Sequence, residues 1–187
     1  MKTSLKVLVF LITILFVSCE DEPLEGFNFV AEPSSGNNGN GTNATIEGLW
    51  KMTAWNVDVP QDLDLNGTAS TNLLNEMDCY NNETVTFNSD FTGVSMTTSY
   101  ADIELNLVSG TTNQFEYSIT CVPNVSSTDL IWTLVGNTLA TTTAGVINNF
   151  TLNGNELSFV IPEGFTVVSD DNSQTIIQDL TIVYTKQ

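Results

Sequence analysis

Residues 114–121 read QFEYSITC and alternate polar with apolar side chains without a break. The apolar places are Phe115, Tyr117 and Ile119, and a glutamate and a serine stand between them. Because successive side chains of a β-strand point to opposite sides of the sheet, this period places the three apolar groups on one face. The segment therefore predicts a strand with one buried face and one face in water.

The same period of two recurs along most of the chain beyond residue 82. Further strands are expected at residues 83–88, 93–100, 102–108, 130–134, 146–152, 157–161 and 176–184. Short runs rich in Asn, Asp, Gly or Pro predict turns between them, as at residues 88–90, 136–137, 153–155, 162–164 and 170–172.

One segment has a helical period instead. In residues 70–77, Leu73, Leu74 and Met77 share a short apolar face at helical spacing. About eight to ten strands with mostly short connections predict an all-β fold, an antiparallel barrel or sandwich with one short helix. We favour the barrel because closure removes the exposed edges of an open sheet.

A resemblance supports the barrel. Gly48-Leu49-Trp50 opens the first expected strand and resembles the Gly-x-Trp signature of lipocalins, whose Trp packs across one end of the barrel. Further matching stretches are residues 72–74, Cys79, residues 84–90, Cys121, residues 132–134, residues 136–139 and residues 183–184. Together they look like the lipocalin-like domain of bacterial surface lipoproteins, over roughly residues 47–187. The resemblance implies a lipocalin-like barrel and says little about function.

The first 18 residues have the features of a bacterial signal peptide. Lys2 and Lys6 precede an apolar run at residues 7–17, which is shorter than the roughly 20 residues that a bilayer span needs. Residues 16–19, FVSC, resemble the lipobox of bacterial lipoproteins, whose Cys is acylated and becomes the new N-terminus. Cys19 is therefore the predicted lipid anchor. An ordinary secreted protein, with Cys19 in a disulfide, is the alternative.

The segment behind the anchor has no hydrophobic period. Residues 19–44 combine two prolines with a Gly/Asn run at residues 36–41, which predicts a flexible linker. Residues 20–22, EDE, resemble an export signal to the outer face of the outer membrane, or simply begin a solvated linker. We expect a signal peptide at 1–18, a lipidated linker at 19–44, a barrel at 45–187 and attachment to the outer membrane, with display on the cell surface left open.

Composition excludes several functions. The chain has no His and no Arg, so neither a Ser-His-Asp triad nor a His-ligated zinc or iron site can form. Removal of Lys2 and Lys6 leaves two lysines against 22 acidic residues, a net charge of 2 − 22 = −20, which repels nucleic acid. Acid pairs such as Asp102 and Glu104 are expected by chance in so acidic a chain. We therefore expect a non-enzyme that binds no nucleic acid.

The two remaining cysteines are expected to pair. Cys79 and Cys121 would form a disulfide in an oxidising compartment, and two buried free thiols are the alternative.

One loop resembles a calcium-binding motif. Residues 62–67, DLDLNG, match the opening of a calcium loop, with Asp62, Asp64 and Asn66 as candidate ligands. The twelfth place is a leucine rather than a glutamate, so Glu76 or Asp78 would have to supply a later carboxylate with different geometry. A solvated acidic turn is the alternative.

A closed barrel would turn a row of large apolar groups inward. The candidate ligand-binding residues are Phe115, Tyr117, Ile119, Trp132, Phe150, Phe159 and Ile182. We predict that they enclose a small apolar or amphipathic ligand, which calls for a cavity of roughly 300–1,000 Å³. In the alternative, the same side chains fill the interior, and the domain is a non-catalytic surface module for structure or interaction, sugar binding included.

Overall fold

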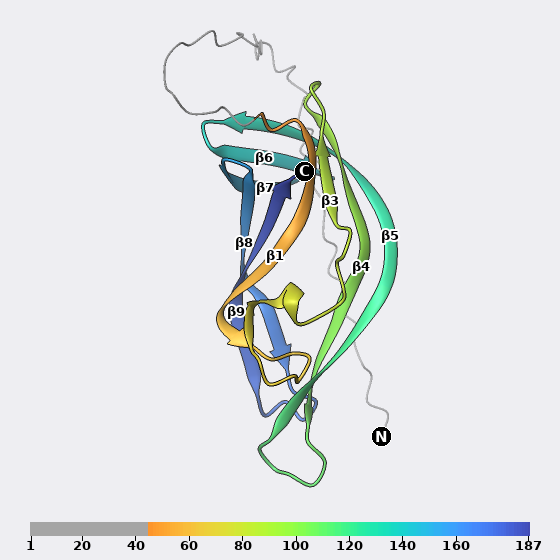
Figure 1. Cartoon of the computed structure of the whole chain (residues 1–187), viewed down its shortest axis with the longest axis vertical. Coiled ribbons are helices and arrows are strands. Elements are labelled where there is room, and N and C mark those ends of the chain that lie inside the picture. Colours follow the sequence, from red (N-terminus) through yellow and green to blue (C-terminus); the bar gives the residue numbers. More distant parts are fainter. Residues whose placement is uncertain (1–44) are drawn as a thin grey trace, which may run out of the picture. The chain divides into compact units, whose positions relative to one another are not determined.

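The computed structural model describes residues 45–187, so the expected signal peptide, Cys19 and linker lie outside the described residues. The described chain is almost entirely β-structure (Figure 1). Its strands are β1 (Gly48–Gln61), β2 (Ser70–Asn72), β3 (Thr84–Phe87), β4 (Thr92–Leu107), β5 (Phe115–Val135), β6 (Thr138–Thr143), β7 (Val146–Asn153), β8 (Glu156–Val168) and β9 (Thr175–Lys186). No helix among residues 45–187 has the length and hydrophobicity that crossing a bilayer requires.

Eight of these strands close into an antiparallel barrel. From β3 to β9 each strand pairs with the next one in the chain, and β1 pairs with β3 on one side and β9 on the other. The extra strand β2 pairs with β1 where the pairing with β3 has ended, starting at Asn56 opposite Asn72. The predicted all-β antiparallel barrel is confirmed, and its consecutive strand order is consistent with a lipocalin-like fold.

Two pairs of expected strands are each one long strand. Residues 93–100 and 102–108 join in β4, and residues 114–121 and 130–134 join in β5. A register shift between β4 and β5 places Thr97 opposite Ser126 but Ser99 opposite Pro123, so the extra residue lies in β5. The inward face of β4 keeps its parity across the shift, since Ser95 lines an interior cavity and Ile103 and Leu105 pack in a core cluster. Met96 and Tyr100, predicted on a shared apolar face, lie on the other face and are 36% and 45% exposed.

Two local predictions were wrong. The expected helix at residues 70–77 is only a 3-10 turn at Leu73–Asn75, because residues 70–72 pair with β1 as a strand. The expected turn at residues 162–164 is an irregularity inside β8, where the register shifts between Ile161 and Phe165 and Glu163 has φ 56°. The strand continues because its pairing with β9 resumes at Phe165.

The buried side chains form two clusters. The first surrounds Trp50, which is fully buried and donates from its indole Nε1 to the Ile46 carbonyl at 2.7 Å. The second gathers Leu63, Leu73 and Cys79 with inward residues of β4, β8 and β9. A long barrel with two cores leaves the space between and beside them available for a site.

Candidate functional site

A cavity of about 210 Å³ lies inside the barrel next to the Trp50 cluster. Every strand from β3 to β9 contributes to its wall, so the lining side chains share the inward face. They are Val85, Phe87, Ser95, Leu130, Thr141, Thr143, Asn148, Phe150, Leu157, Phe159, Ile182 and Tyr184. The interior at this level is therefore not completely filled by its own side chains.

The wall of this cavity has an aromatic part and a polar part. Phe150 packs on Phe159 with ring centroids 5.2 Å apart and meets Tyr184 edge-on at 6.3 Å. The polar part is made by the hydroxyls of Ser95, Thr141 and Thr143 and the amide of Asn148, and Thr141 is buried. Such a wall suits a ligand with an apolar body and one hydrogen-bonding group.

Tyr184 is the ionisable side chain of the lining. Burial raises its pKa to about 12, and the negative charge of Glu83 contributes to the same shift. Its phenol therefore keeps its proton at neutral pH and can donate a hydrogen bond into the cavity.

We expect alkaline pH to weaken the fold through Tyr184. The folded pKa of about 12 lies above the ordinary value of 10.0, so the folded state holds the proton more tightly than the unfolded chain. The contribution of Tyr184 to the free energy of unfolding is fully present below pH 10. It is lost as the pH rises from 10 to about 12, which lowers that free energy by about 2–3 kcal/mol. Urea unfolding at both pH values should show this loss in the wild type and a smaller one in Tyr184→Phe. Equal losses would contradict the assignment.

The predicted ligand-binding residues do not form one site. Phe150, Phe159 and Ile182 line the cavity, as expected. Tyr117 and Ile119 instead line a second pocket of about 510 Å³. The strands are long, so residues 115–121 lie far along β5 from the part of that strand that reaches the cavity.

The other two predicted residues are structural. Phe115 packs against the second core cluster. Trp132 is buried beside Phe87, and its Nε1 donates to the carbonyls of Asn88 and Thr92 at 3.2 and 3.0 Å. The polar lining of β6 was not predicted, although Leu139, Thr141 and Thr143 alternate there, because the prediction rested on apolar residues alone.

The predicted disulfide is present. Cys79 and Cys121 are bonded with their Cα atoms 5.3 Å apart, and Cys79 is buried in the second core cluster. The bridge ties the segment before β3 to the wall formed by β5.

In the acidic loop after β1, the third candidate ligand of the calcium motif, Asn66, does not join the two aspartates. Asn66 turns its side-chain oxygen to the backbone N–H of Thr68 at 2.8 Å and donates from Nδ2 to Asp64 at 2.8 Å. Glu76 takes the place next to the two aspartates, since one ligand atom each from Asp62, Asp64 and Glu76 lie within 4.8 Å of one another.

Glu83 is a buried carboxylate, only 4% exposed. Its carboxylate accepts from the backbone N–H and hydroxyl of Thr98 and from the N–H of Ser99, at 2.8–3.1 Å. The pairing of β4 with β3 ends at Met96, so Glu83 accepts from backbone groups of β4 just beyond that pairing. Its role is structural.

Comparison of the chain with family models, with curated proteins and with solved structures gave no match.

Proposed function

We propose that the barrel is a non-catalytic binder of a small amphipathic molecule with a largely apolar body. The observation that supports this function is the interior cavity of about 210 Å³ with its aromatic and hydroxyl-bearing walls. Its volume exceeds the roughly 150 Å³ cavity that admits benzene and falls short of the roughly 300 Å³ expected for drug-sized ligands. The ligand is accordingly the size of a small ring system or a short acyl group.

The chemistry of the lining favours binding over catalysis. Tyr184, the one ionisable group of that lining, stays protonated at neutral pH and cannot act as a base there. Asp102 and Glu104, a pair of carboxylates two residues apart, are exposed on β4 and absent from the cavity wall. A completely filled barrel acting as an interaction module is the second candidate, and the open cavity argues for the binder.

A native mass spectrum of the protein purified from its own membrane tests this function. We expect one small organic molecule per chain in the wild type. Asn148→Phe, which places a ring at the cavity wall, should lose that mass, whereas Asn149→Phe on the outer face should keep it. The absence of any added mass in the wild type would favour the interaction module.

We also propose that Cys19 carries lipid and holds the barrel on the outer membrane. The support is the short apolar run at residues 7–17 that ends at a small residue and Cys19. Two or more acyl chains would anchor the protein stably, whereas one would hold it only marginally. The linker at residues 19–44 would then separate the barrel from the membrane surface.

Cys19→Ser is expected to move the protein from the detergent-rich to the aqueous phase in a detergent phase partition. Ser18→Ala, which keeps a small residue before the cysteine, should leave the protein in the detergent-rich phase. If Cys19→Ser still enters the detergent-rich phase as the wild type does, the lipid anchor is wrong.

A further inference from the structure

We propose that Asp62, Asp64 and Glu76 bind one calcium ion at the end of β1. The two aspartates lie in the loop that follows β1, and Glu76 follows the 3-10 turn at Leu73–Asn75. One carboxylate oxygen from each lies within 4.8 Å of the others, which is the spacing of ligands around one cation. This site is separate from the interior cavity, and the inference does not depend on the proposed function.

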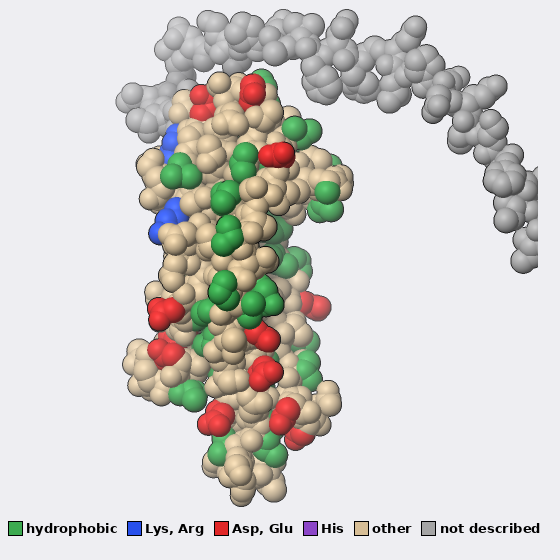
Figure 2. Space-filling view, turned by 90° about the vertical axis from the view of Figure 1, so that its right-hand side faces the viewer, with side chains coloured by type: hydrophobic (Ala, Val, Ile, Leu, Met, Phe, Trp, Pro, Cys, Tyr) green, Lys and Arg blue, Asp and Glu red, His purple; other side chains and the backbone are tan. Residues whose placement is uncertain are grey.

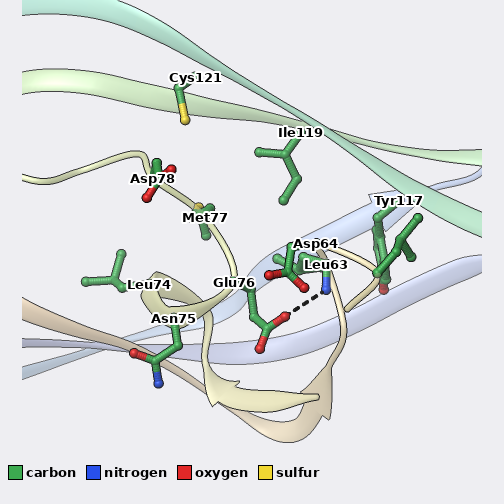
Figure 3. Close-up of a pocket in the computed structure, with 11 residues that line it drawn as sticks. Leu63, Asp64, Leu74, Asn75, Glu76, Met77, Asp78, Tyr117, Ile119 and Cys121 are labelled. Atoms are coloured by element: carbon green, nitrogen blue, oxygen red, sulfur yellow. Dashed lines mark hydrogen bonds between the residues drawn. The ribbon is translucent and has the colours of Figure 1, made fainter. Parts of the chain in front are cut away.

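Figure 3 shows two of the three carboxylates, Asp64 and Glu76. The side chains of Asp64 and Glu76 both lie at the loop beside Leu63, which sits between the two aspartates in the chain. A pocket of about 510 Å³ opens beside Asp64 and Glu76, so water has access to complete a coordination shell.

Two carboxylates of the cluster, the buried Glu76 and the partly buried Asp62, have incomplete hydrogen bonding. Glu76 is only 4% exposed, yet the one hydrogen bond it accepts from the described residues comes from Leu63 N to Oε2 at 3.2 Å. Asp62 Oδ1 is buried and has no hydrogen-bond partner among the described residues, while Oδ2 accepts from Gly67 N at 3.0 Å. Burying a carboxylate oxygen without a donor is costly, and such oxygens are rare in native proteins. A cation between these oxygens would satisfy them.

No side-chain cation of the described chain neutralises the cluster. The lysines of residues 45–187 are Lys51, near the start of β1, and Lys186, at the end of β9, where it lies opposite Trp50. Lys186 bonds to Thr45 and lies over the Trp50 ring. The loop with Asp62 follows the other end of this 14-residue strand, about 30 Å away along an extended chain. Figure 2 shows the basic side chains in the upper half of the view only, whereas acidic side chains lie both there and over the lower half.

The donor set selects calcium. All the available ligands are oxygens, which suit a hard cation rather than zinc or copper. Calcium accepts six to eight oxygens in flexible arrangements, so irregularly placed carboxylates and pocket waters can serve it. Magnesium demands a near-ideal octahedron and keeps most of its water. Asn66 is committed to Thr68, so the chain offers Glu76 as its third ligand in place of the motif's amide.

The test uses the full chain in a non-ionic detergent, freed of metal by a chelator. Calorimetric titration with calcium should give one ion per chain, and the melting temperature should be about 3–8 °C higher in millimolar calcium than in chelator. Glu76→Gln keeps the shape of the side chain and should weaken calcium binding at least tenfold. Asp64→Asn, at an exposed position, should do the same if Glu76→Gln folds poorly. Asp78→Asn, an exposed acid at the same pocket, is the matched control and should bind as the wild type does.

Three results would overturn the proposal. The first is a wild-type melting temperature that is the same in calcium and in chelator. The second is binding that survives both Glu76→Gln and Asp64→Asn, since the ion would then lie elsewhere. The third is a rise in melting temperature that magnesium produces and calcium does not.

Discussion

Replacing both Cys79 and Cys121 with alanine should lower the free energy of unfolding by about 4 kcal/mol. The two cysteines are 42 residues apart, so the bridge restricts a long loop in the unfolded chain. It also holds Cys79 in the core beside Leu63 and Leu73. The described residues 45–187 lie in one compact unit, and urea unfolding of that unit with and without the substitutions measures the difference.

Two controls accompany the cysteine prediction. Reduction of the unit should raise its intact mass by two hydrogens, and the reduced wild type should unfold at nearly the same urea concentration as the double alanine variant. Free thiols in the native, non-reduced protein would contradict the disulfide.

Trp50→Ala should cost about 3–5 kcal/mol of unfolding free energy. Trp50 has no exposed surface and packs among residues of the first core cluster, including Val85, Leu139 and Leu157. Its removal leaves a cavity and also frees the Ile46 carbonyl, which accepts from the indole at 2.7 Å. Guanidinium unfolding of the variant measures the loss.

The neighbour of this tryptophan supplies the control. Leu49 points outward and is 43% exposed, so Leu49→Ala should change stability by no more than about 0.5 kcal/mol. Similar losses in the two variants would mean that the alternation of β1 does not bury Trp50 as described.

The main architecture could be predicted from local patterns. Alternation such as that of residues 114–121 fixes which face of a strand is apolar, and a series of such strands with short turns leads to a closed antiparallel sheet. The disulfide followed from counting, because Cys79 and Cys121 are the two cysteines within the expected domain.

The details that the sequence did not predict depend on contacts between distant residues. No local period reveals the register shift between β4 and β5, or the buried Glu83 that accepts hydrogen bonds from Thr98 and Ser99 beside it. The strand at residues 70–72 forms because β1 offers a partner, which overrides a helical pattern. Glu76 joins Asp62 and Asp64 through the path of the chain rather than through a fixed spacing.

The cavity shows the same limit at the candidate site. Apolar residues were expected to line one pocket, but strands of up to 21 residues distribute them over two cores and two pockets. Thr141 lines the interior because its strand alternates, but a polar residue does not contribute to the apolar pattern from which the wall was predicted. The period of two in the sequence predicts which face of the sheet a side chain lies on. The length and register of the strands determine which of these side chains come into contact.

Titration of residues 41–187 with a neutral naphthylamine fluorophore tests the central claim most directly. A neutral probe avoids repulsion by the acidic surface, and its emission rises in an apolar site. The account predicts saturable binding of one probe per chain, at least tenfold weaker in Asn148→Phe and unchanged in Asn149→Phe. Absence of saturable binding by the wild type, or equal binding by both variants, would contradict a ligand site inside the barrel.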